Sequence, residues 1–238
     1  GYHAALLSLS AYKDDSIEDM LAHCQELAKH IPLIGFYLQP AVGGRILPYS
    51  FWRKFAEIDN LLAIKIAPFN RYQTLDVARA VCDAGRENAV TLYTGNDDNI
   101  LIDLISEYKF QTDKGEKRIR IKGGLLGHWC VWTKKAVEQL EKMQQISNEE
   151  SVHSDVLSLA LQVTDCNAAF FDAANNFKGC IPGIHEVLRR QGLLEGTWCL
   201  NPDEVLSEGQ SEEIDRVYKA YPELNDDEFV KENLQKWL

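Results

Sequence analysis

The sequence predicts an α/β fold in which helices cover a parallel sheet. Short apolar segments alternate with amphipathic segments of helical spacing through residues 1–146. The apolar segments are nearly continuous, which is typical of parallel strands buried on both faces. From about residue 147 the alternation stops, and every segment has helical spacing. We therefore expect five β/α units in residues 1–146 and a C-terminal helical region, residues 147–238, packed on them.

Each of the five expected strands is a short apolar run followed by a helix. The strands are residues 4–12, 33–39, 61–70, 89–95 and 118–132, and the helices are residues 16–31, 48–59, 74–85, 98–108 and 134–146. Ser16 is a candidate N-cap of the first helix, with Asp19 at the position where a capping box prefers Glu or Gln. Pro68 stops the third strand, because proline cannot donate to a central ladder.

The region from residue 147 onward is predicted to be entirely helical. Its expected helices are residues 151–163, 168–177, 183–194, 211–221 and 227–238. The segments CIPG, LNPD and YPELND are expected breaks, because proline and turn-forming residues interrupt helices.

Composition and charge limit the partners of this protein. Its 238 residues carry 36 Asp and Glu against 25 Lys and Arg, a formal net charge of −11. This balance argues against a nucleic-acid or anionic-membrane surface and favours small-molecule or protein partners. No apolar run reaches the roughly 18 residues that a membrane helix needs. The six cysteines form no CxxC pair, as expected of thiols in a reducing compartment, so we expect a cytoplasmic protein.

A lysine lies in the middle of the third expected strand. Strict alternation would place Leu61, Ala63, Lys65 and Ala67 on one face and Leu62, Ile64 and Ile66 on the other. Because a buried ammonium is costly, such a lysine reaches solvent, pairs with an acid, or has its pKa lowered by desolvation. The first alternative makes Lys65 an ordinary strand-end residue. The last makes it an amine nucleophile that forms a Schiff base with a carbonyl.

Tyr37 is a candidate acid/base for that lysine. It lies near the end of the preceding strand, before Pro40 and the Gly43-Gly44 turn. The carboxyl ends of neighbouring parallel strands meet at one rim, where α/β proteins keep their active sites. A tyrosine there donates or accepts a proton. The alternative is a packed aromatic residue with a satisfied hydroxyl.

Several segments match a known pattern in order and spacing. They are YLQP at Tyr37, AIKIA around Lys65, YTGNDD at the next strand end, GGLLGHWCVW after it, and IPGIHEVLRRQGLL in the tail. In these segments the sequence resembles the dihydrodipicolinate synthase and N-acetylneuraminate lyase family. The resemblance implies a (β/α)8 TIM barrel, of which this chain would contain strands 4 to 8. It also implies a class I aldolase-type lyase or synthase that forms a Schiff base with a 2-oxo acid such as pyruvate.

The resemblance implies roles for individual residues. Lys65 would be the nucleophile and Tyr37 the proton shuttle over the bound keto acid. Tyr12 would complete a proton relay across a subunit interface. Gly95 and the backbone around Trp129 match positions whose carbonyls approach the lysine. No cofactor is implied, and the family pattern implies a homo-oligomer, either a dimer or a tetramer of two dimers.

The sequence departs from the family pattern in two respects. Val42 stands where the synthases carry an arginine that holds a substrate carboxylate. Arg45 and Arg71 are candidate replacements, because a guanidinium binds a carboxylate bidentately. For each of them, a solvated surface arginine is an equally good interpretation. The matching segments begin at the family's fourth strand. We therefore expect the 238 residues to be the C-terminal part of a longer protein.

Two other functions remain open. A non-catalytic barrel used for binding or regulation would keep the scaffold without the reaction, and the arginine missing at position 42 favours it. A metal-dependent aldolase needs three or more converging ligands. His128 at a strand end, with Asp97 and Asp98, is the candidate set.

Overall fold

The computed structural model describes residues 1–238, apart from the side chain of Ala41. Its strands are β1 (Ala5–Leu7), β2 (Leu33–Tyr37), β3 (Leu61–Ile66), β4 (Thr91–Thr94), β5 (Glu107–Thr112) and β6 (Gly115–Gly124). Its α-helices are α1 (Ile17–Ala28), α2 (Tyr49–Phe55), α3 (Arg71–Asp83), α4 (Ile100–Ile105), α5 (Thr133–Ile146), α6 (Asp155–Phe170), α7 (Cys180–Arg190), α8 (Gln210–Ala220) and α9 (Asp227–Trp237). The chain divides into two compact units, one formed by residues 1–96 and 103–125 and the other by residues 97–102 and 126–238.

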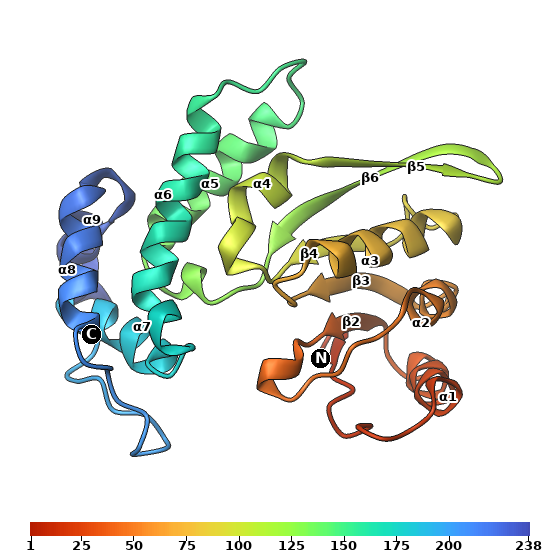
Figure 1. Ribbon diagram of the computed structural model, residues 1–238, viewed down its shortest axis with the longest axis horizontal. Helices are drawn as coiled ribbons and strands as arrows, with labels where there is room; N and C mark the ends of the chain where they lie inside the picture. The colour runs from red at the N-terminus through yellow and green to blue at the C-terminus, as the bar shows by residue number, and fades with distance from the viewer. The chain divides into compact units, whose positions relative to one another are not determined.

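The first unit contains one six-stranded sheet. The strand order is β1-β2-β3-β4-β6-β5, in which β5 runs antiparallel to β6 and all other neighbours are parallel. The five strands expected from the sequence are therefore confirmed as β1, β2, β3, β4 and β6. Helices α1, α2 and α3 follow one another along the sheet (Figure 1). The prediction of an α/β fold with a parallel sheet covered by helices is correct.

Aromatic residues of α2 form the centre of the core between helices and sheet. Phe51, Trp52 and Phe55 are all buried. A Cβ atom at Gly35 of β2 would lie 2.6 Å from Cε1 of Phe55, so the glycine lets that ring rest against the strand. The ring centroid of Trp52 lies 4.9 Å from that of Tyr37. Gly35 and Tyr37 therefore lie on the helix-facing side of β2, and Phe36 between them faces the other side.

At the start of β3, the side chains do not follow the strict alternation between the two faces of the sheet. The register with β2 shifts between Leu33 and Ile34, so Leu61 is buried while Leu62 is 45% exposed. Leu62 therefore does not share the buried face of Ile64 and Ile66, where strict alternation would place it, because the irregularity at the start of the strand reverses the face. From Ala63 onward the expected pattern holds.

The β5–β6 hairpin was not predicted. The helix expected over residues 98–108 ends at Ile105, and residues 107–112 form β5 instead. Gly115, with φ of 95°, begins the return strand in a backbone conformation that favours glycine. Of β6, only residues 118–124 lie within the strand expected over residues 118–132.

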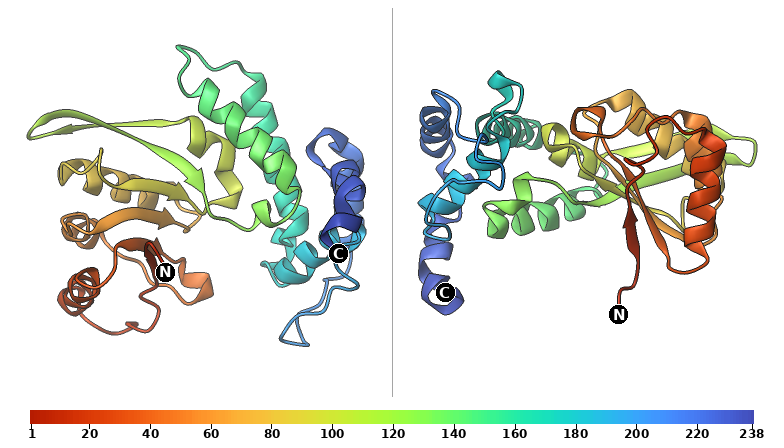
Figure 2. Two further views of the ribbon diagram at one scale, coloured as in Figure 1. Left: turned by 180° about the vertical axis from the view of Figure 1, so that it is seen from behind. Right: turned by 90° about the horizontal axis from the view of Figure 1, so that it is seen from below.

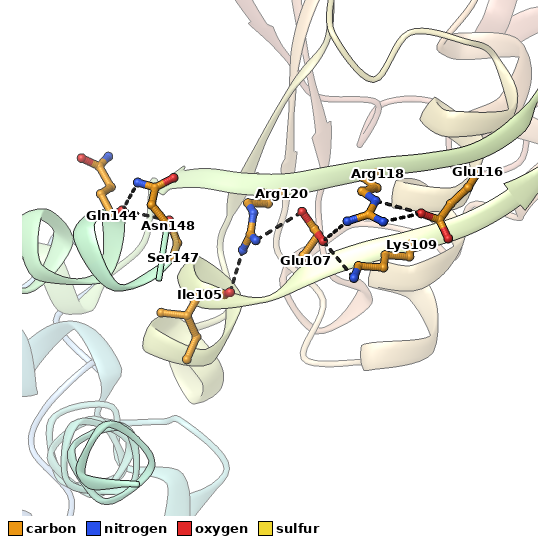
Figure 3. A network of polar contacts seen from close by, with 9 residues as sticks. All are labelled: Ile105, Glu107, Lys109, Glu116, Arg118, Arg120, Gln144, Ser147 and Asn148. Atoms are coloured by element: carbon orange, nitrogen blue, oxygen red, sulfur yellow. Dashed lines mark hydrogen bonds and ion pairs between the residues drawn. The ribbon is translucent and has the colours of Figure 1, made fainter. Parts of the chain in front are cut away.

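Charged side chains pair across this hairpin. The carboxylate of Glu107 lies 3.3 Å from Arg118 and 3.2 Å from Arg120, and Arg120 also donates to the carbonyl oxygen of Ile105 at 2.9 Å (Figure 3). Cross-strand pairs of opposite charge stabilise an antiparallel pair. This pairing depends on residues that are eleven or more positions apart, so a local pattern could not reveal it.

Two helix starts show how local sequence sets the bounds. The Ser16 hydroxyl accepts a hydrogen bond from the backbone N–H of Asp19 at 3.1 Å, which confirms the expected N-cap of α1. The expected break at CIPG is wrong, because α7 begins at Cys180. Pro182 is tolerated there, since a residue in the first turn needs no intrahelical donor.

The second unit contains helices α5 to α9. Helix α8 packs on α6 and on α7 (Figure 2). The ring centroid of Trp132 lies 4.9 Å from that of Phe170 and 5.1 Å from that of Tyr218. The predicted helical region is thus present. Helix α5, which was expected in the first domain, belongs to this unit. The domain boundary expected at residue 146 stays a prediction.

The six cysteines are free thiols; Cys24, Cys82 and Cys166 are buried, whereas Cys130 is exposed. Among the residues that the structure describes, no helix combines the length and the apolar character needed to cross a membrane.

Candidate active site

Four residues in register form a row across the sheet near the carboxyl ends of its strands. Phe36 of β2 pairs with Lys65 of β3, and Lys65 pairs with Tyr93 of β4. Tyr93 in turn pairs with Gly123 of β6. Register partners point to the same face of a sheet, and neighbouring strands lie about 4.8 Å apart. These four residues, called the lysine row below, therefore share the face opposite Gly35 and the helices.

Lys65 occupies a half-buried position in the middle of the row. Its Nζ atom lies 4.4 Å from the centroid of the Phe36 ring. A cation–π contact of this kind contributes about 0.5–1 kcal/mol at a partly exposed site. Lys65 is also partly withdrawn from solvent, and partial desolvation is a feature of lysine nucleophiles.

Tyr93 lies on the other side of Lys65 and is 37% exposed. A Cβ atom at Gly123 would lie 3.2 Å from Cε1 of Tyr93, so the tyrosine ring rests directly over the glycine backbone. A larger residue at position 123 would displace the ring. The lysine row therefore holds a phenol beside the amine, at a position that the sequence analysis did not select.

Tyr37 lies outside the lysine row. It pairs in register with Ile66, one residue beyond Lys65, so its side chain points to the opposite face. There it is fully buried against Trp52, and its hydroxyl both donates to the carbonyl of Leu47 at 3.3 Å and accepts from the N–H of Leu47 at 3.2 Å. Burial raises the pKa of Tyr37 above its usual value. The structure does not bring Tyr37 and Lys65 together, because a one-residue offset reverses the face of a strand.

Arg71 also lies on the helix-facing side. It forms an ion pair with the buried carboxylate of Asp103, which accepts a second bond from the hydroxyl of Thr94 at 2.6 Å. Thr94 pairs in register with Ile66, so this network is on the face opposite Lys65. The Nε and Nη2 atoms of Arg71 make no hydrogen bond. Its expected role as an anion anchor stays a prediction, at a place separate from the lysine row.

Arg45 and Tyr12 contact each other. One guanidinium nitrogen of Arg45 donates to the carbonyl oxygens of Tyr12 and Asp15, each at 2.9 Å. The ring centroid of Tyr12 lies 4.7 Å from that of His23. Arg45 therefore holds the loop that follows β1. The substrate-binding role expected for Arg45 and the relay role expected for Tyr12 stay predictions.

Gly95 permits a close approach between the ends of β3 and β4. Its N–H donates to the carbonyl of Ile66 at 2.6 Å, and a Cβ atom at Gly95 would lie 3.0 Å from Cα of Ala67. The backbone at Gly95 thus lies next to the residue that follows the lysine strand. The role expected for Gly95 beside Lys65 stays a prediction.

Trp129 and the candidate metal ligands belong to the second unit. Trp129 lies in the short 3-10 helix His128–Cys130, where its carbonyl accepts from the Thr133 hydroxyl at 3.1 Å. The backbone N–H of His128 donates to a carboxylate oxygen of Asp97 at 2.8 Å. The imidazole of His128 stacks on Phe170, and burial lowers its pKa to about 4. In the part of the chain that the structure describes, no group of three or more His, Cys, Asp or Glu is arranged to hold a metal.

Known proteins resemble this chain in structure. No protein-family model matches the sequence, and no curated protein matches it. Dihydrodipicolinate synthase from Bacteroides thetaiotaomicron aligns with 12% identity and a TM-score of 0.69 over 92% of this chain and 67% of its own. The 2-keto-3-deoxygluconate aldolase of Sulfolobus aligns with 13% identity and a TM-score of 0.61 over 92% and 64%. The protein CdNal from Clostridium difficile, solved in complex with mannosamine, aligns with 15% identity and a TM-score of 0.62 over 93% and 66%.

The chain spans about two thirds of the length of these structures, 64–67%. Its fold is that of part of a (β/α)8 barrel, a parallel sheet with covering helices, as the sequence predicted. These structural neighbours all belong to the dihydrodipicolinate synthase and N-acetylneuraminate lyase family of class I aldolases, the family that the sequence motifs resemble. At 12–15% identity, this likeness establishes the fold.

Proposed function

We propose that the protein is a Schiff-base-forming lyase or synthase that acts on a 2-oxo acid, with Lys65 as its nucleophile. The observation that carries the proposal is the place of Lys65 in the middle of the lysine row, on the face opposite the helices. In a closed barrel that face lines the interior, and active sites lie at the carboxyl ends of its strands. Lys65 is the penultimate residue of β3, which puts it near that end.

The proposed reaction begins when the amine of Lys65 attacks a carbonyl carbon. The nitrogen lone pair of Lys65 attacks C2 of the 2-oxo acid, and loss of water gives an iminium. The positive nitrogen then accepts electrons from a breaking bond at C3, so an enamine forms there. The enamine allows carbon-carbon cleavage, condensation or dehydration. The half-buried position of Lys65 supports this role, because a fully solvated ammonium is a poor nucleophile.

The names of the structural neighbours support the same class of reaction. They are a dihydrodipicolinate synthase, a 2-keto-3-deoxygluconate aldolase and CdNal, which was solved with mannosamine. From these names we infer for this chain only the class of reaction, that of a lyase or synthase acting on a small molecule. A homo-oligomer with Tyr12 near the contact and a cytoplasmic location are parts of the same proposal, supported by the family resemblance and by six free thiols.

The direct test is reduction of the Schiff base. The purified, intact protein is incubated with pyruvate, 2-keto-3-deoxygluconate or N-acetylneuraminate and then with borohydride, and the adduct is located by peptide mass spectrometry. We expect the adduct on Lys65. Lys65→Arg should abolish it, while Lys54→Arg, on a lysine side chain that is 57% exposed, should leave it unchanged. An intact protein that forms no adduct with a broad panel of 2-oxo acids would exclude the mechanism.

The same experiment separates the alternatives. A non-catalytic barrel would bind a keto acid without a reducible adduct. A metal-dependent aldolase would cleave its substrate without an adduct and would lose activity with a chelator.

A further inference from the structure

We propose that Tyr93 is a catalytic residue that gives and takes the protons at the carbonyl attacked by Lys65. This inference rests on the proposed function of Lys65. It assigns the proton-transfer role to a residue of β4, in place of Tyr37 on β2.

Position is the first support. Tyr93 is the direct register partner of Lys65, on the same face of the sheet. The other partner of Lys65 is Phe36, whose ring has no proton to transfer. Tyr93 is 37% exposed, so the residue is not sealed off from a ligand that approaches this face.

Orientation is the second support. The Nζ atom of Lys65 lies over Phe36, toward β2, while the ring of Tyr93 lies over Gly123, toward β6. The two side chains therefore diverge from their adjacent Cα positions. A planar carbonyl group placed between them would have the amine on one side and the phenol on the other. General acid–base transfer requires such an arrangement, with the acid within hydrogen-bond reach of the substrate oxygen.

The environment of Tyr37 is the third support. Its hydroxyl donates to and accepts from the backbone of Leu47, and its ring packs against Trp52 on the helix-facing side. To face Lys65, β2 would have to slip by one residue, which would move every side chain of the strand to the opposite face. Gly35 would then be replaced by a bulkier residue against the ring of Phe55, where even a Cβ atom has no room.

The proton transfers balance without any other reactant. Attack by the neutral amine of Lys65 gives a zwitterion, whose oxyanion takes the Tyr93 proton and whose ammonium returns one to the tyrosinate. Tyr93 next protonates the C2 hydroxyl, which leaves as water while the nitrogen lone pair forms the C=N bond. The tyrosinate is then paired with the iminium, and it removes a proton from C3 to give the enamine. Tyr93 ends the sequence protonated.

The test is the rate of adduct formation with pyruvate under borohydride trapping. Tyr93→Phe keeps the ring over Gly123 and removes only the hydroxyl, so the variant should fold normally. General acid–base groups typically contribute about 10²–10⁴-fold, and we expect the trapping rate to fall at least tenfold. The pH profile of the trapping rate should also lose one ionisation, whereas removal of a purely structural hydroxyl would leave the profile unchanged. Tyr72→Phe, on a tyrosine that is 82% exposed, is the matched control and should behave like the wild type.

The outcomes distinguish the role of Tyr93 from the proposed function of Lys65. An unchanged trapping rate and pH profile in Tyr93→Phe, with a normal adduct in the wild type, would overturn the role of Tyr93 and leave Lys65 in place. A loss of trapping in Tyr37→Phe and not in Tyr93→Phe would overturn it in favour of Tyr37. A wild-type protein without an adduct would overturn the proposed function, and the role of Tyr93 with it.

Discussion

The two faces of the sheet hold polar residues in contrasting ways. On the helix-facing side, Tyr37 is bonded to the backbone of Leu47, and Thr94 to the carboxylate of Asp103. On the other face, Lys65 lies over an aromatic ring and Tyr93 is partly exposed. Buried polar groups must be paired within the protein, so those on the helix-facing side stabilise the fold. The difference suggests that residues of the lysine row can be substituted at little cost in stability, and that the helix-facing residues cannot.

The largest effect on stability is expected at Asp103. Asp103→Asn keeps the size of the side chain and removes the charge opposite Arg71, while Asp103 is only 1% exposed. We expect the free energy of unfolding to fall by about 2–3 kcal/mol. Removing one partner of a fully buried pair costs roughly 3–5 kcal/mol, and Arg71 is 39% exposed. Urea unfolding measures the change.

Asp76→Asn is the matched control for that substitution. The pair of Asp76 with Arg79 is exposed on both sides, so its loss should change stability by less than about 0.5 kcal/mol. Equal effects at the two positions would mean that burial of Asp103 does not make its ion pair more important for stability than the exposed pair of Asp76. A loss of adduct trapping in folded Asp103→Asn would place Arg71 in the substrate site.

A smaller loss of stability is expected at Tyr37. Tyr37→Phe leaves the buried N–H and carbonyl of Leu47 without their partner, which costs about 1–2 kcal/mol. Thermal or urea unfolding should show this loss, while borohydride trapping of the folded variant should stay within about twofold of the wild type. A stable variant with impaired trapping would show that Tyr37 acts in the reaction.

Gly123→Ala should affect the reaction more than the fold. The added Cβ atom would lie 3.2 Å from the ring of Tyr93, so the ring must shift by a small distance. A misplacement of 1 Å costs on the order of 100-fold in rate, and we therefore expect a loss of about twofold to tenfold in trapping. The double variant with Tyr93→Phe should be no slower than Tyr93→Phe alone. Additive losses in the two substitutions would mean that Gly123 does not act through Tyr93.

The smallest effect concerns alkaline pH. Burial raises the pKa of Tyr37 above the usual value of 10.0, so the unfolded chain loses this proton at a lower pH than the folded protein does. The stabilisation is therefore complete below pH 10.0 and is lost as pH rises from there through the folded pKa. The stability difference between the wild type and Tyr37→Phe should decrease above that pH in urea titrations. A constant difference would indicate that Tyr37 is not held protonated by its surroundings.

Much of the fold could be predicted because its signals are local. The strands are short apolar runs between amphipathic helices, and near-continuous apolar strands indicate a parallel sheet. Ser16 could be recognised as a cap because its partner is three residues away. The β5–β6 hairpin was missed because its ion pairs join residues that are distant in sequence, and α7 began earlier than expected because proline fits a first turn.

The site could be predicted only in part. Lys65 stood out because a charge is unusual in an apolar strand, and its face was predicted correctly from Ala63 onward. Tyr37 was predicted to be the proton shuttle because it lies in the YLQP motif and near the end of a strand. Tyr93 drew no attention, since it is one aromatic residue in a strand where aromatic residues are common.

The sequence by itself determined the alternation of five parallel strands with helices, the lysine in the third of them, and the motifs that resemble one enzyme family. Tertiary structure decided which tyrosine accompanies that lysine. Strand register depends on packing between distant segments, here the ring of Phe55 against Gly35 and the ring of Tyr93 over Gly123. Because a shift of one residue moves a side chain to the other face, Tyr37 lies among the helices and Tyr93 lies beside Lys65.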